Sequence, residues 1–135
     1  MLTDPLRHTI QELAGRYPRK EAALIPALHA VQKHFNYIPT ESVSEIAQIL
    51  ELPETRIYDV LSFYTMFKTR PVGRYHIQVC RTLSCHCRGA QDLLSALETL
   101  CGVPCNGSVS SDGRFSIESV ECLGACTGAP VIQVN

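Results

Sequence analysis

The sequence has little of what marks several large classes of protein. Its 135 residues carry a formal net charge of −1, which gives little support to non-specific binding of nucleic acid or of an anionic membrane surface. No uncharged stretch reaches the roughly 18 apolar residues of a membrane-spanning helix. The first residues lack the basic-then-apolar pattern of a signal peptide. We therefore expect a cytoplasmic protein with no nucleic-acid partner and no direct membrane insertion.

Nucleotide-binding fingerprints are also missing, because neither G-x-G-x-x-G nor G-x4-G-K occurs in the chain. We therefore expect it to bind no dinucleotide or flavin by itself and to perform no hydride chemistry of its own. What is present is a globular balance, with 45% hydrophobic and 19% charged residues.

The cysteines and the charges divide the chain at residues 70 and 71. Residues 1–70 contain no cysteine and eight residues of each charge, whereas residues 71–135 contain all seven cysteines and only nine charged residues. Pro71 and Gly73 punctuate the boundary. An odd number of cysteines without an export signal is more typical of metal ligands or catalytic thiols than of structural disulfides. We expect a helical region over 1–70 and a cysteine-bearing domain over 71–135.

Apolar residues in the front part recur at helical spacing and predict a bundle. The expected helices cover about 4–17, 19–35, 42–50 and 53–64, and Pro26 is expected to kink or delay the second. Ser42 and Glu45 fit a capping box for the third. Phe63, Tyr64 and Phe67 are expected at the surface, where clustered aromatic residues favour a protein interface.

The back part alternates between strands and loops. Strands are expected over 75–79, 115–120 and 131–134, a helix over 90–101, and two cysteine-bearing loops over 80–89 and 121–130. Cys80 and Cys85 follow one strand, and Cys122 and Cys126 follow another. If these two strands run in the same direction in one sheet, both loops meet at one end and bring four thiolates together.

Four thiolates in two pairs match the chemistry of a [2Fe–2S] cluster, whose two irons take their ligands separately. The pairs read C-x4-C and C-x3-C, which are compatible with zinc but wider than many structural zinc knuckles. Glycines in both loops allow backbone amides to approach sulfur. Arg81, Arg88 and the N-terminus of the following helix are expected to offset the negative charge of the cluster.

Three segments, VCRTLSC-x2-RGA, ECLGACTGAPVIQVN and YDVLSFYTMFKTRPVGRYHIQVC, resemble the E subunit of bacterial NADH–quinone oxidoreductase (complex I). They equally resemble the small diaphorase subunits of NAD-linked hydrogenases and formate dehydrogenases. The resemblance covers nearly the whole chain. It implies an α+β fold, with a helical bundle followed by a thioredoxin-like [2Fe–2S] ferredoxin domain that is shortened at its C-terminus. Cys80, Cys85, Cys122 and Cys126 match the four ligands of the family.

The resemblance also implies an electron-transfer role within an NADH dehydrogenase-type complex. One [2Fe–2S] cluster is expected on this chain, and FMN, NAD(H) and a further Fe–S cluster on a partner flavoprotein subunit. Such a complex would hold the chain at the inner face of the cell membrane. The final acceptor differs between the related complexes and stays open between quinone, protons and carbon dioxide.

Three cysteines are spare in this assignment. Cys101 is expected in the core and Cys105 in a loop, although their C-x3-C spacing also resembles a ligand pair. Cys87 stands where the family commonly has an apolar residue, and it is an alternative ligand to Cys85. Two other functions remain open at this point: a zinc-stapled interaction module and a thioredoxin-like disulfide enzyme, although the latter usually has C-x-x-C at a helix start.

Overall fold

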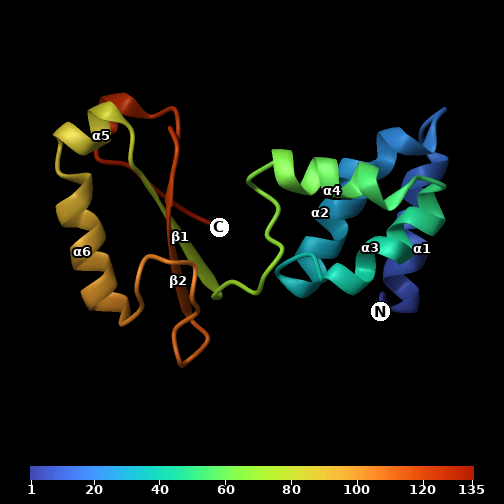
Figure 1. Ribbon diagram of the computed structural model, residues 1–135, viewed down its shortest axis with the longest axis horizontal. Coiled ribbons are helices and arrows are strands. Elements are labelled where there is room, and N and C mark those ends of the chain that lie inside the picture. Colours follow the sequence, from blue (N-terminus) through green and yellow to red (C-terminus); the bar gives the residue numbers. More distant parts are fainter. The chain divides into compact units, whose positions relative to one another are not determined.

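The chain forms two compact units, Met1–Pro71 and Val72–Asn135, in a computed structural model that describes residues 1–135. The first unit contains only helices, and the second combines helices with a small sheet (Figure 1). This composition confirms the expected α+β class. None of the helices is both long and apolar enough to cross a membrane.

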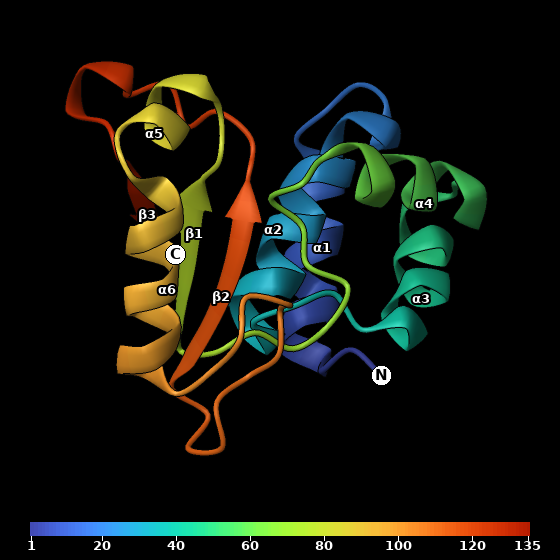
Figure 2. The same cartoon turned by 60° about the vertical axis from the view of Figure 1, so that its left-hand side comes forward.

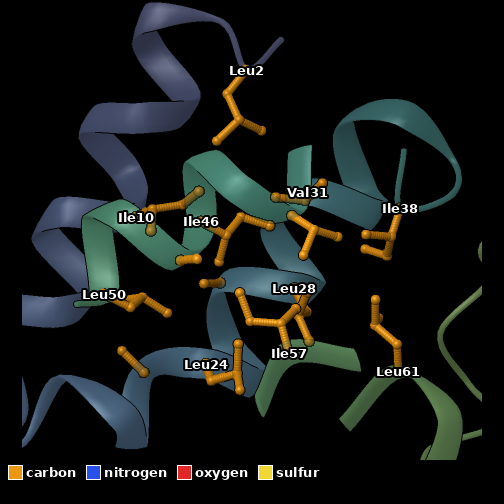
Figure 3. Close-up of a cluster of buried hydrophobic side chains, with 14 of the residues drawn as sticks. Leu2, Ile10, Leu24, Leu28, Val31, Ile38, Ile46, Leu50, Ile57 and Leu61 are labelled. Carbon is orange, nitrogen blue, oxygen red and sulfur yellow. The ribbon is translucent and has the colours of Figure 1, made fainter. Parts of the chain in front are cut away.

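The first unit is built from four α-helices and one short 3-10 helix: α1 (Asp4–Gly15), η1 (Lys20–Ala23), α2 (Leu24–Phe35), α3 (Thr40–Leu50) and α4 (Glu54–Phe63). Their apolar faces meet in one core, shown in Figure 3, which includes Ile10, Leu28, Ile46 and Ile57. These side chains fall at the helical spacing seen in the sequence, so the bundle follows from amphipathic periodicity. Pro26 is tolerated because it lies in the first turn of α2, where its missing N–H has no helical partner.

Two details of the bundle differ from the sequence-based expectation. Ser42 does not begin a helix, because α3 already starts at Thr40 and the buried Ser42 hydroxyl donates to the Pro39 carbonyl at 2.6 Å. Glu45 has no capping role and instead accepts the backbone N–H of Leu2 at 3.1 Å. Phe67 is only 4% exposed and belongs to the core, so it does not join an exposed aromatic cluster.

The second unit contains a three-stranded sheet in the order β2-β1-β3. The elements of this unit are β1 (Tyr75–Cys80), α5 (Leu83–Cys87), α6 (Ala90–Cys101), β2 (Phe115–Val120), η2 (Cys126–Gly128) and β3 (Ile132–Val134). β1 and β2 are parallel, with Tyr75 opposite Phe115 and Cys80 opposite Val120. β3 is antiparallel to β1 and follows the cis Ala129–Pro130 peptide bond.

The core of the second unit lies between α6 and the sheet. Ile77, Val79 and Ile117 are buried there, and Leu94 and Leu97 of α6 pack against them. Figure 2 shows α6 running alongside β1 and β2, with α5 beyond the end of the strands. Because β1 and β2 are parallel, the segments that follow them leave the sheet at the same edge. That edge carries the cysteines.

Candidate metal centre

The four cysteines singled out in the sequence lie on segments that leave the same edge of the sheet. Cys80 is the last residue of β1, and Cys85 lies within α5. Cys122 lies just beyond the end of β2, and Cys126 is the first residue of η2. The structure thus brings both predicted pairs to one end of the second unit. The loop expected over 80–89 contains a short helix, α5. The sequence did not reveal it because five residues are too few to show a helical repeat.

The first pair is buried. Cys80 and Cys85 are 2% and 1% exposed, and they share a small apolar cluster with Ala90. Hydrogen bonds from the hydroxyl and the backbone N–H of Thr82 lower the pKa of Cys80 to about 7. Burial raises the pKa of Cys85, and its hydrogen bond with Cys80 raises it further. Cys80 therefore forms a thiolate more readily than Cys85.

The second pair is exposed. The Sγ atoms of Cys122 and Cys126 are 3.9 Å apart. The backbone N–H of Gly124 donates to Cys122 Sγ at 3.4 Å, and this contact is the main cause of the lowered pKa of Cys122. Gly124 adopts a left-handed conformation with a φ of +75°, which explains why glycine stands there. The expected approach of a loop amide to sulfur is thus found at this position.

The donor set fits a two-iron cluster in its chemistry, and the spacing within the second pair fits two ligands of one metal. Two sulfurs on one tetrahedral metal with bonds of about 2.3 Å lie about 3.8 Å apart, close to the distance between Cys122 and Cys126. Two pairs of soft thiolates are what the two irons of a [2Fe–2S] cluster require.

The charges around the thiols differ in part from the expectation. Arg81 forms an ion pair with Glu121, which also raises the pKa of Arg81 through their hydrogen bond. Glu121 therefore compensates most of the charge of Arg81, and Arg81 offsets less of the negative charge of a cluster than expected. The first residue of α6, Ala90, packs against Cys80 and Cys85, so the positive end of the α6 dipole lies beside the buried pair.

The three spare cysteines have different surroundings. Cys87 is exposed at the end of α5, whereas Cys85 is buried. Cys101 and Cys105 pack against the α6 core, a different cluster from the one that contains Cys80 and Cys85. Burial raises the pKa of Cys105, and the negative charge of Glu98 adds to the effect.

Sequence reasoning missed Thr82. Its hydroxyl oxygen lies 3.2 Å from Cys80 Sγ, and the same hydroxyl contributes to the lowered pKa of Cys122. Its only signal in the sequence was its place two residues after a strand-ending cysteine.

A parallel β-α-β unit with an added antiparallel strand, bearing two thiol pairs at one edge, is the arrangement that the resemblance implied for a thioredoxin-like domain of the iron–sulfur type. The family model for thioredoxin-like [2Fe-2S] ferredoxins matches residues 10–135. The chain belongs to this family, as the resemblance in the sequence implied.

Relatives in two bacteria match almost the whole chain. The second of the NADH-quinone oxidoreductase E subunits of Rhizobium meliloti (strain 1021) is 43% identical over 130 residues, which are 96% of this chain and 77% of the relative. The NADH-quinone oxidoreductase E subunit of Aquifex aeolicus (strain VF5) is 41% identical over 132 residues, which are 98% of this chain and 82% of the relative.

The fold also matches part of a solved hydrogenase. In the NAD+-reducing [NiFe]-hydrogenase in its H2-reduced state, the similar region has a TM-score of 0.68 and 26% sequence identity. The match covers 83% of this chain but only 18% of the hydrogenase chain.

Proposed function

We propose that this chain is the electron-transferring E subunit of an NADH–quinone oxidoreductase and binds one [2Fe–2S] cluster through Cys80, Cys85, Cys122 and Cys126. The observation that carries the proposal is the meeting of two thiol pairs at the end of two parallel strands. Membership of a [2Fe-2S] ferredoxin family and the relatives among E subunits support it. A [2Fe–2S] cluster supplies one-electron storage when bound, because it changes its charge by one unit on reduction.

The residues of the chain bind, orient and shield such a group. Cys80 and Cys85 are held by the end of β1 and by α5 and exclude water on the buried side. The amide of Gly124 and the positive end of α6 stabilise negative charge on the sulfurs. Cys122 and Cys126 lie at the surface, which leaves one side open to close approach by an electron-transfer partner.

The proposed partner is a flavoprotein subunit that binds NADH and FMN and carries a further Fe–S cluster. The proposal assigns the oxidation of NADH to this partner, since the sequence of the chain contains neither G-x-G-x-x-G nor G-x4-G-K. Through this complex the chain would sit at the cytoplasmic, inner face of the cell membrane. A second candidate is the diaphorase subunit of an NAD-linked hydrogenase, which the match to the NAD+-reducing [NiFe]-hydrogenase favours. The resemblance in the sequence adds the diaphorase subunit of a formate dehydrogenase to this candidate.

The first experiment measures iron, acid-labile sulfide and zinc in the anaerobically purified full chain. The expected result is two irons and two sulfides per chain, with visible absorption and a rhombic paramagnetic signal after reduction. Alanine in place of any one of the four proposed ligands should abolish or strongly reduce cluster content. Cys101→Ser is the matched control, because Cys101 is a cysteine of the same unit that packs in a different cluster from Cys80 and Cys85.

One stoichiometric zinc without iron would contradict the proposal and favour a zinc-stapled module. Full iron content in all four alanine variants would also contradict it. The choice between the two complexes is made by isolating the chain with its native companions: a quinone-reducing membrane complex supports the first candidate, and a hydrogenase or formate dehydrogenase large subunit supports the second.

A further inference from the structure

Thr82 occupies a position where threonine usually has another task. It is the residue before α5, with an extended backbone (φ −76°, ψ 170°). A threonine hydroxyl at such a position commonly accepts a backbone N–H of the first helical turn. Here the side chain makes no capping hydrogen bond, and its Oγ1 lies 3.2 Å from Cys80 Sγ instead. The hydroxyl is directed to sulfur rather than to the helix.

The contacted sulfur belongs to Cys80, which is the last residue of β1 and one of the four proposed ligands. Thr82 is half-buried, which limits competition from water for its hydrogen bond.

The direction of this hydrogen bond follows from the chemistry of a bound metal. A cysteine that binds iron has lost its proton, so the Thr82 hydroxyl has to be the donor and the sulfur the acceptor. A donated hydrogen bond stabilises negative charge on sulfur, and it does so more strongly in the reduced cluster, which carries one more negative charge. The effect is therefore to favour reduction.

We propose that Thr82, through the contact of its hydroxyl with Cys80, is a positioning residue that raises the reduction potential of the cluster. This inference rests on the proposed function, since it concerns the same four cysteines. It assigns a role to a residue that binds no metal itself and that acts only through its hydrogen bond to the sulfur of Cys80.

The test is a redox titration of the full, cluster-loaded chain, followed by the paramagnetic signal of the reduced form. Thr82→Val removes the hydroxyl but keeps the branched shape, and Thr82→Ser keeps the hydroxyl. Thr127→Val is the control, because Thr127 is an exposed threonine next to Cys126. In Thr82→Val, reduction should become about tenfold less favourable, which is about 59 mV for one electron. Thr82→Ser and Thr127→Val should keep a potential close to that of the unmodified chain.

An unchanged potential in Thr82→Val, or an equal shift in Thr127→Val, overturns the inference while leaving the proposed function intact. If the unmodified chain contains no iron, the proposed function fails, and the inference fails with it. Thr82→Ala is measured alongside, in case valine impairs loading. If neither variant retains iron while Thr82→Ser does, Thr82 is needed for assembly and the inference is wrong as stated.

Discussion

Replacing Gly73 with alanine tests how closely the start of β1 is fitted to β2. A Cβ atom at Gly73 would lie 2.4 Å from the carbonyl carbon of Phe115 and 2.7 Å from the backbone nitrogen of Ser116. Both neighbours are backbone atoms of β2, so no side-chain rotation relieves the contact. The Gly73 N–H also donates to the Ser116 hydroxyl at 2.9 Å, which fixes the segment in this place.

The loss of stability in Gly73→Ala comes from overpacking alone, because the φ angle of Gly73 does not lie in the left-handed region that alanine disfavours. Forcing one extra methyl group into a well-packed site costs about 1–3 kcal/mol. In a unit of this size, 1 kcal/mol corresponds to a change of about 4–8 °C in the unfolding midpoint. We therefore expect the midpoint of the second unit to fall by about 4–24 °C. The clash lies at the opposite end of β1 from Cys80, so the spectrum of the folded, loaded protein should not change.

The assay is thermal unfolding of the cluster-loaded chain, followed by visible absorption for the second unit and by far-ultraviolet circular dichroism for the helices. Gly15→Ala is the matched control, since a Cβ there meets nothing within 4 Å. It should leave the visible transition in place and stabilise the first unit by no more than about 1 kcal/mol. An unchanged visible midpoint in Gly73→Ala would refute the argument from close approach.

Two further predictions concern the helical core and the spare thiols. Leu28→Ala should destabilise the first unit by about 2–5 kcal/mol, since Leu28 is 0% exposed and its truncation leaves a cavity; Leu100→Ala, at an 83% exposed position, should change stability little, and equal effects in urea unfolding would contradict the prediction. In the loaded protein, iodoacetamide should modify the exposed Cys87 first, as followed by mass spectrometry. Cys105 should react more slowly than Cys87 at the same pH, because burial and then the negative charge of Glu98 raise its pKa. The neutral thiol is favoured in the folded state, so the stability from this group is present at low pH and is lost as the pH rises through the raised pKa. Equal labelling of both thiols at about pH 8 would show that this view of their surroundings is wrong.

The sequence predicted those parts of the fold that leave a repeating pattern. The helical apolar spacing predicted the bundle around Leu28, and alternation predicted β1 and β2. The direction of the two strands was only a condition in the sequence-based argument, and the register shows that β1 and β2 are parallel. Features that depend on contacts between distant segments were not accessible. Glu45 resembled a cap in sequence, but Leu2 and Arg7, far away in the chain, provide its hydrogen bonds.

The candidate site was partly accessible for the same reason. Four cysteines in two spaced pairs after two strands are a pattern, so the convergence followed once the strands were taken as parallel. A single threonine between cysteines is not a pattern, and only the turn into α5 directs the Thr82 hydroxyl to Cys80. The compensation of Arg81 by Glu121 was equally hidden, because the pair joins two loops that are 40 positions apart.

The two cysteines of α5, Cys85 and Cys87, are chemically identical candidate ligands, and the geometry of the helix distinguishes them. In the sequence, Cys85 and Cys87 lie in one segment, and both were candidate ligands. Residues two positions apart on an α-helix point in directions about 200° apart. When Cys85 is buried against Cys80, Cys87 therefore has to face solvent, as it does. Replacing Cys85 by Cys87 as a ligand would require turning α5 or unwinding it, at the cost of its backbone hydrogen bonds. The geometry of this short helix thus favours Cys85, and it leaves Cys87 free to react at the surface.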